Sequence, residues 1–120
     1  MLINLTNHPS ALWSAKQTET ANREFGEIVD IPFPLVSPLA DEEDIKRIAD
    51  EYANKILATA AGREVTVHVM GEMTFTVLMV RRLQAAGITC VASTTERLVE
   101  EQNGGVKVAR FEFVKFRRYI

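Results

Sequence analysis

The stretch Val65-Thr66-Val67-His68-Val69-Met70-Gly71-Glu72-Met73-Thr74 decides the fold. An alternating apolar strand runs into a short polar segment, and an apolar helix from about Thr74 to Ala86 follows. After Gly87 a second apolar strand leads to the polar segment Ser93-Thr94-Thr95-Glu96-Arg97. This order predicts two parallel strands, because a crossover helix joins them. The polar segments after the two strands then lie at one edge of the sheet, where open α/β sheets bind ligands.

The segments before this unit extend the same pattern. The sequence predicts a buried strand at 1–5 and a helix at 14–26 that begins with the capping-box residues Ser14 and Gln17. A strand at 27–31, a proline-rich connector at 32–40 and a helix at 41–62 with Asp41 as its N-cap are expected to follow. After Arg97, residues 98–101 are ambiguous. The turn signal Asn103-Gly104-Gly105 precedes an alternating stretch, Val106–Tyr119.

These elements predict the α/β class. We expect one Rossmann-like domain over residues 1–120, with a mainly parallel sheet flanked by helices and a C-terminal β-hairpin or paired edge strands. Hydrophobic residues make up 47% of the chain and charged residues 25%, which is typical of a soluble globular protein. No membrane-spanning run or secretion signal is seen, so a cytoplasmic protein is expected. Cys90, the single cysteine, is expected to be a buried small apolar residue.

The net charge of −2 argues against the binding of long nucleic acid, which usually needs a basic excess. The charges are unevenly distributed, however. Ten of the sixteen acidic residues lie between Glu19 and Glu51, and six of the fourteen basic residues lie from Arg97 onward. A local basic surface near the C-terminus is therefore expected to hold a small anionic ligand.

The common catalytic motifs are absent from the sequence. There is no HExxH, paired-cysteine or calcium-loop pattern, so we expect no metal site. There is also no Walker A loop, GxGxxG or GxSxG motif, and no cofactor is expected. The remaining candidates are the polar residues at the strand ends.

Three polar segments should converge if the first, third and fourth strands are neighbours: Asn7-His8, Gly71–Thr74 and Ser93–Arg97. Gly71 would let a ligand approach the backbone, and the amides that begin the next helix would suit a phosphate. Thr74 equally suits a simple N-cap. Ser93, Thr94 and Thr95 suit phosphate or ribose oxygens, or an ordinary strand end. Arg97 suits a phosphate clamp, or a surface bridge to Glu72 or Glu96.

Two histidines and one tryptophan have alternative roles. His8 suits a general acid or base near neutral pH, although a loop histidine is often merely structural. His68 alternates with valines, so we expect a packed, hydrogen-bonded side chain on the face opposite to theirs. Trp13 suits either adenine stacking or burial in the core.

Three motifs resemble those of small CRISPR-associated proteins related to the CARF domain. They are Gly71-Glu72-Met73-Thr74-Phe75-Thr76, Arg82-Leu83-Gln84-Ala85-Ala86-Gly87-Ile88 and Ala92-Ser93-Thr94-Thr95-Glu96-Arg97, and the ending Phe113-Val114-Lys115-Phe116-Arg117-Arg118-Tyr119 is also similar. Members of that family form homodimers and bind cyclic oligoadenylate, the second messenger of type III CRISPR defence. Stand-alone members are ring nucleases, which linearise it.

The resemblance implies a site at the strand ends. We predict a ligand-binding set of Asn7, Gly71, Met73, Thr74, Ser93, Thr94 and Thr95, with Arg97, Glu72 and His8 as the groups that carry the chemistry. A ribose 2′-hydroxyl would attack its neighbouring phosphate without metal, because positioning and charge stabilisation supply much of the rate. Arg97 would stabilise the developing charge, and His8 or Glu72 would move protons.

A homodimer is also expected. A cyclic ligand with repeated units matches a twofold interface, and the broad apolar surface of the helix at 74–86 offers a place for one. The sequence also fits two other functions. One is a non-catalytic module that senses a nucleotide, and the other is an interaction protein that uses its terminal hairpin.

Overall fold

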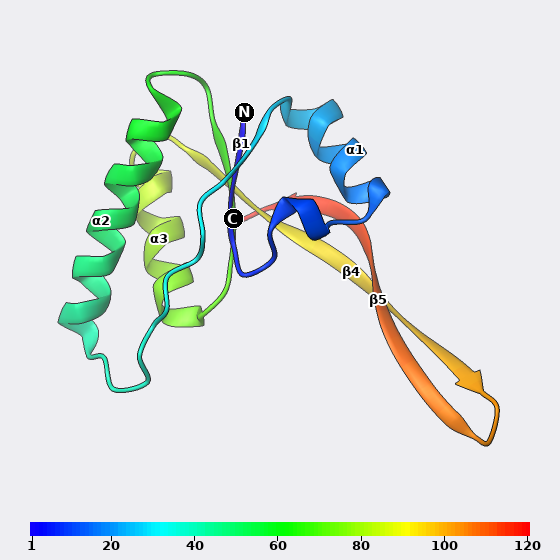
Figure 1. Cartoon of the computed structure of the whole chain (residues 1–120). Coiled ribbons are helices and arrows are strands. Elements are labelled where there is room, and N and C mark those ends of the chain that lie inside the picture. Colours follow the sequence, from blue (N-terminus) through cyan, green and yellow to red (C-terminus); the bar gives the residue numbers. More distant parts are fainter.

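The computed structural model describes residues 1–120 and has the predicted α/β architecture. Its one sheet has five strands in the order β2-β1-β3-β4-β5. The strands are β1 (Leu2–Thr6), β2 (Ile28–Asp30), β3 (Thr66–Met70), β4 (Thr89–Gln102) and β5 (Val106–Arg118). All neighbouring pairs are parallel except β4 and β5, which are antiparallel. The mainly parallel sheet with a C-terminal hairpin is thus confirmed (Figure 1).

Helices cover both faces of the sheet. Helices α2 (Glu42–Ala60) and α3 (Met73–Ala85) pack on one face, and α1 (Ala15–Phe25), preceded by a short 3-10 turn (Ser10–Leu12), lies on the other (Figure 1). Side chains along a strand alternate between these faces. In β1, Ile3 and Leu5 join the core under α2 and α3, whereas Leu2 joins the core with Trp13 under α1. Asn4 therefore points to the α1 side.

The helix ends follow the predicted capping chemistry, with one correction. The Ser14 hydroxyl accepts from the Gln17 amide, and Asp41 and Asp44 form a reciprocal capping box at the start of α2. The N-cap of α3 is Glu72, not Thr74. The Glu72 carboxylate accepts from the amides of Thr74 and Phe75, because its longer side chain reaches both.

The prediction that a polar loop follows the fourth strand at Ser93–Arg97 is wrong. These residues lie inside β4, which stays paired with β5 from Val91 to Gln102 with a bulge at Thr94 and Thr95. Strand β5 supplies a continuous set of hydrogen-bond partners, so a β-branched stretch that would otherwise end a strand continues it. The predicted turn at 103–105 closes the hairpin, with positive φ angles at Gly104 and Gly105. The outer half of this hairpin projects away from the body (Figure 1).

Most apolar residues of α3 are buried in the core and do not lie on the exposed face of the helix. Phe75, Met79, Val80 and Leu83 are buried, whereas Met73 and Val77 remain exposed. Cys90 is buried as expected, and burial raises the pKa of its thiol to about 11, so it stays protonated at neutral pH. None of the helices combines the length and the apolar character needed to cross a membrane.

Candidate functional site

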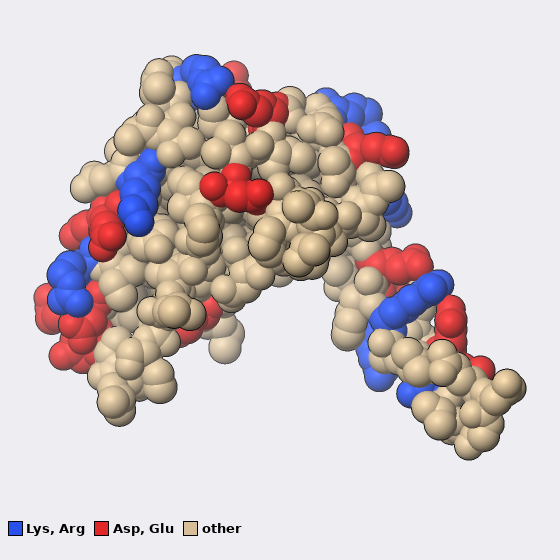
Figure 2. All heavy atoms as spheres, in the orientation of Figure 1, with Lys and Arg blue, Asp and Glu red and all other residues tan.

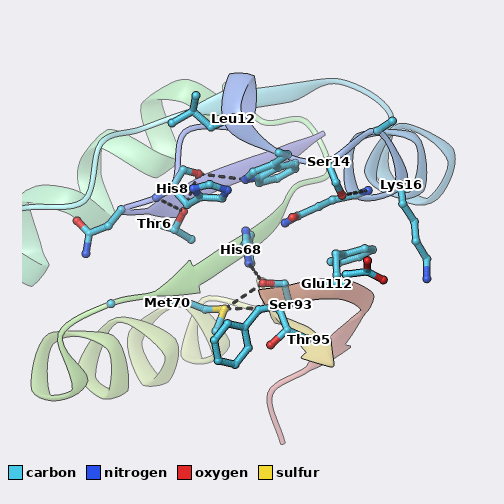
Figure 3. A pocket seen from close by; sticks show the side chains of 17 residues that line it. Thr6, His8, Leu12, Ser14, Lys16, His68, Met70, Ser93, Thr95 and Glu112 are labelled. Carbon is cyan, nitrogen blue, oxygen red and sulfur yellow. Dashed lines mark hydrogen bonds between the residues drawn. The ribbon is translucent and has the colours of Figure 1, made fainter. Parts of the chain in front are cut away.

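An open cavity of about 960 Å³ lies on the α1 side of the sheet, at the carboxyl ends of β1 and β3. Its walls come from four parts of the chain: the loop after β1, the start of α1, the end of β3 and the inner part of the β4–β5 hairpin (Figure 3). Strand β2 lies on one side of β1, and β3 and β4 lie on the other side, so the strand order reverses at β1. The cavity lies at this reversal, where open α/β sheets usually bind ligands. Its volume is within the range of small-molecule pockets.

Five of the predicted site residues line this cavity. Asn7 and His8 come from the loop after β1, Gly71 follows β3, and Ser93 and Thr95 lie on β4. The three segments therefore converge because β1, β3 and β4 are neighbours in the sheet. In the sequence, the polar residues that follow each buried strand indicated this convergence.

Glu72, Met73 and Thr74 do not line the cavity, because α3 packs on the opposite face of the sheet. The free amides that were expected to bind phosphate are occupied by Glu72, which accepts from Thr74 N at 3.1 Å and Phe75 N at 2.8 Å. The hydrogen bond from the Phe75 amide lowers the pKa of Glu72, and those from Thr74 add to this effect, while burial opposes it. Glu72 is thus a helix cap in this structure.

Thr94 and Arg97 also lie outside the cavity lining. The Thr94 hydroxyl donates to the Lys115 carbonyl and accepts from the Lys115 amide. Arg97 is paired in register with Phe111, which does line the cavity, so both project from the same face of the hairpin. Arg97 forms no bridge to Glu72 or Glu96, and it lies two cross-strand pairs beyond Thr95 and Phe113. Its position is therefore at the outer rim.

The expected basic surface of the C-terminal segment is interrupted by acidic partners. Arg110 pairs with both Glu100 and Glu112 at 3.2 Å. The cation that lines the cavity is instead Lys16, at the start of α1. Lys16 is not among the site residues predicted from the sequence, because only the packing of α1 beside the ends of β1 and β3 brings it to the cavity.

A row of four polar side chains crosses the sheet beneath the cavity. They are Asp30, Asn4, His68 and Ser93, one from each of the neighbouring strands β2, β1, β3 and β4. Asn4 Nδ2 donates to Asp30 Oδ1 at 2.8 Å, Asn4 Oδ1 lies 3.0 Å from His68 Nδ1, and His68 Nε2 lies 3.1 Å from Ser93 Oγ. Asn4 pairs in register with both Asp30 and His68, so strand geometry alone sets these three side chains on one face.

The hydrogen bonds fix the tautomer of His68. Asn4 Nδ2 donates to Asp30 and to the His8 carbonyl, so Asn4 Oδ1 is the acceptor that faces the ring. His68 Nδ1 must therefore carry the proton, and the lone pair of Nε2 faces the Ser93 hydroxyl. Burial, with a smaller contribution from the charge on His8, lowers the pKa of His68 to about 4. The ring is neutral at pH 7, as the prediction of a packed, hydrogen-bonded histidine requires.

Asp30 ends the row at the edge strand. Its carboxylate accepts from the Ser10 amide and hydroxyl as well as from Asn4. Burial opposes ionisation of this carboxyl, but the hydrogen bonds from Asn4 and Ser10 lower its pKa below its ordinary value. Neither Asp30 nor Asn4 was proposed as a site residue from the sequence. The available signal was the single polar residue Asn4 inside a buried apolar strand.

Aromatic side chains form one wall of the cavity. Trp13 is buried, as one of its two predicted roles requires, and its indole nitrogen donates to the His8 carbonyl at 3.0 Å. Its ring packs edge-on against His68 at 5.6 Å. Phe113 is buried beside Phe116, whereas Phe111 is 66% exposed at the rim. Phe111 is therefore the aromatic face that remains free to stack.

Gly71 is explained by packing in the structure. The ring of the buried Phe33 occupies the space where a Cβ of residue 71 would lie. Phe33 belongs to the core under α2 and α3, so this contact is on the side away from the cavity. The backbone of Gly71 still lines the cavity. No cluster of three or more His, Cys, Asp or Glu residues is placed to hold a metal ion.

Comparison with protein families matches residues 1–117 to the family described as "Uncharacterized protein MJ1673 family". No curated protein matches the chain, and no solved structure does.

Proposed function

The chain belongs to the MJ1673 family, and we propose that it is a stand-alone CARF-like protein that binds cyclic oligoadenylate and cleaves it. One observation carries this proposal: backbone and polar groups that follow β1 and β3 or lie on β4, together with aromatic side chains and one lysine, surround a single open cavity. This combination suits a ligand that has bases, hydroxyls and phosphates. The resemblance of the strand-end motifs to ring nucleases of type III CRISPR defence supplies the ligand class.

Different lining residues would contact the base, the ribose and the phosphate of such a ligand. Phe111 offers an exposed ring for an adenine, since base stacking on an aromatic side chain tolerates any base. Asn7, Ser93 and Thr95 offer hydrogen bonds to ribose and phosphate oxygens. Lys16 neutralises a phosphate within the cavity, and Arg97 reaches a part of the ring that extends past the rim. Met73, Thr74 and Thr94 have no direct part in this arrangement.

The proposed cleavage uses a 2′-hydroxyl of the ligand itself. The hydroxyl attacks the adjacent phosphate, and the reaction leaves a 2′,3′-cyclic phosphate and a 5′-hydroxyl. His8, on the exposed loop that rims the cavity, is the group that moves protons, because Glu72 is held at the start of α3. The cavity holds the ribose in line, and Lys16 stabilises the developing charge.

Turnover of cyclic tetra- and hexa-adenylate in EDTA tests this proposal. We expect linear products that end in a 2′,3′-cyclic phosphate. His8→Ala should lower kcat by about 100-fold, the lower range for a positioned acid or base, with little change in KM. Lys16→Ala should raise KM and also lower kcat, because it removes a phosphate contact that strengthens as negative charge develops. Lys55→Ala on α2 is the matched control, since Lys55 does not line the cavity and contacts only Glu51 and the Tyr52 ring through its ammonium. Absence of both binding and turnover would exclude the function.

A homodimer is part of the proposed function, because a twofold axis supplies one set of strand-end groups to each half of a cyclic ligand. Exposed apolar residues for its interface are Met73 and Val77 on α3 and Val99, Val106 and Val108 on the hairpin. Light scattering at micromolar concentration, with and without cyclic oligoadenylate, is expected to give twice the monomer mass. A monomer under both conditions would remove this part of the proposal.

A non-catalytic sensor is the second candidate, and the projecting hairpin favours it. This arm carries exposed valines beside the ion-paired residues Glu100, Arg110 and Glu112 (Figure 2). Such a mixed surface suits contact with a partner protein. Retention of cyclic oligoadenylate without any linear product would favour this candidate over the enzyme.

A further inference from the structure

Apart from the ligand contact of Ser93, the polar row beneath the cavity has no task in the proposed cleavage, in which the ligand supplies its own nucleophile. We propose that Ser93 is an activated nucleophile, with His68 as its general base and Asn4 as the positioning residue, and that it cleaves phosphate esters that lack a 2′-hydroxyl. This inference goes beyond the proposed function, because the attacking oxygen belongs to the protein and the substrate need not be a ribonucleotide.

The geometry has the three relationships that an activated serine requires. The nucleophile is within hydrogen-bond reach of the base, since Ser93 Oγ lies 3.1 Å from His68 Nε2. The base is held by a third group, since His68 Nδ1 lies 3.0 Å from Asn4 Oδ1. Asn4 is in turn anchored by Asp30 at 2.8 Å, so the ring cannot rotate without breaking a chain of bonds across four strands.

The direction of the Ser93 hydroxyl follows from its two possible acceptors. Met70 Sδ lies 3.3 Å from Ser93 Oγ, and His68 Nε2 lies at 3.1 Å. A thioether sulfur is a weak acceptor, whereas the lone pair of a neutral imidazole is a strong one. The hydroxyl proton therefore points at Nε2, which leaves the lone pairs of Oγ free for a substrate. Ser93 lies in the wall of the cavity (Figure 3).

Ser93 and His68 differ in solvent exposure, and this difference suits a nucleophile and its base. Ser93 is partly exposed in the cavity wall, where a substrate can reach it. His68 also borders the cavity, but it is only 2% exposed and packs against Trp13 and Phe116, so little of its ring is open to water. Lys16 and His8 lie in the same cavity and offer donors to the phosphate oxygens.

The reaction balances with water as the only other reactant. Ser93 Oγ forms a bond to phosphorus while its proton passes to His68 Nε2. The bond from phosphorus to the leaving oxygen breaks, and the imidazolium returns the proton to that oxygen. Water then attacks the phosphoserine, gives a proton to Nε2 and releases Oγ, which takes the proton back. A buried imidazolium is costly, so esters with good leaving groups should react fastest.

Two probes without a 2′-hydroxyl test this inference in the full-length protein. The first is hydrolysis of bis(p-nitrophenyl) phosphate, and the second is covalent labelling by a fluorophosphonate, with the labelled residue mapped by mass spectrometry. We expect hydrolysis and a label on Ser93. Ser93→Ala should abolish both, and His68→Gln should slow both by about 100-fold. Ser37→Ala, an exposed serine on the connector before α2, is the control and should change neither.

A charge swap tests the positioning role of Asn4. In the double variant Asn4→Asp with Asp30→Asn, the amide of residue 30 donates to a carboxylate that now faces His68 Nδ1. The labelling rate of the natural protein should fall below about pH 4, where His68 becomes protonated. The swap should move this fall toward neutral pH, because a carboxylate favours the imidazolium. The ionisable groups around the row and the cavity are His8, Asp30, Lys16 and Glu112. The same measurement in a His8→Gln background removes the charge of His8, which contributes to the lowered pKa of His68.

The inference is wrong if no label is found on Ser93, or if Ser93→Ala hydrolyses the diester as fast as the natural protein. Its failure is distinguishable from failure of the proposed function. Cyclic oligoadenylate turnover without diester hydrolysis would leave the ring nuclease and remove the serine. Diester hydrolysis and a labelled Ser93 without turnover of cyclic oligoadenylate would do the reverse.

Discussion

The free energy of unfolding is expected to fall by about 3 kcal/mol as the pH is lowered from 6.5 to 4, owing to His68 alone. Burial lowers the pKa of His68 from 6.5 to about 4 in the folded protein. Between these values the unfolded chain binds a proton that the folded chain does not. The stabilising contribution is therefore complete above pH 6.5 and is lost as the pH falls through the folded-state pKa.

Other groups with lowered pKa values act mainly in a different window. Protonation of Asp30 and Glu72 in acid also lowers the free energy of unfolding. Their ordinary pKa values of 3.8 and 4.5 place most of that loss below pH 4.5. Urea unfolding at half-unit steps from pH 7 to 4.5 should thus report chiefly on His68. His68→Gln should flatten the curve in that range, whereas His8→Gln should keep most of its slope. An equally steep curve for His68→Gln would contradict the assignment.

Asn4→Leu is expected to destabilise the fold by about 2–4 kcal/mol, although leucine is the more apolar residue. Asn4 is 1% exposed and holds the centre of the polar row. Leucine leaves the proton of His68 Nδ1 without an acceptor, and it removes donors from Asp30 and from the His8 carbonyl. The unsatisfied N–H of buried His68 costs about 1–3 kcal/mol. The hydrogen bonds lost by Asp30 and by the His8 carbonyl, which keep their donors from Ser10 and Trp13, add to this cost.

Urea unfolding at pH 7 measures this effect, and Asn7→Leu provides the matched control. Asn7 is the next asparagine along the chain and is exposed, so its change is expected to stay within about 0.5 kcal/mol. A cycle with His68→Leu should show strong coupling, because removal of both partners leaves no unsatisfied pair between them. An Asn4→Leu protein as stable as the natural one would show that the row carries no stability.

The sequence by itself determined the elements and the order in which they occur. The alternation of Val65–Val69, the capping residues Ser14 and Asp41 and the turn at Asn103–Gly105 are local signals, and each one appears in the structure at the predicted place. Parallel pairing of β3 and β4 followed from the helix between them. The convergence of Asn7 and Gly71 followed in turn, because the parallel neighbours β1 and β3 end at one edge, and Ser93 joins them from inside β4.

Tertiary structure alone decided which polar residues share the cavity. Ser93–Arg97 became strand rather than loop because β5, far along the chain, pairs with it, and that pairing carries Arg97 to the rim. The packing of α3 on the far face turned Glu72 and Thr74 away, while the return of α1 brought in Lys16. The row from Asp30 to Ser93 exists only because strand register aligns Asn4 with Asp30 and His68, and because Ser93 lies two residues beyond Val91, the partner of His68 on β4. Local patterns encode the period of each strand, but register and face depend on contacts between distant segments.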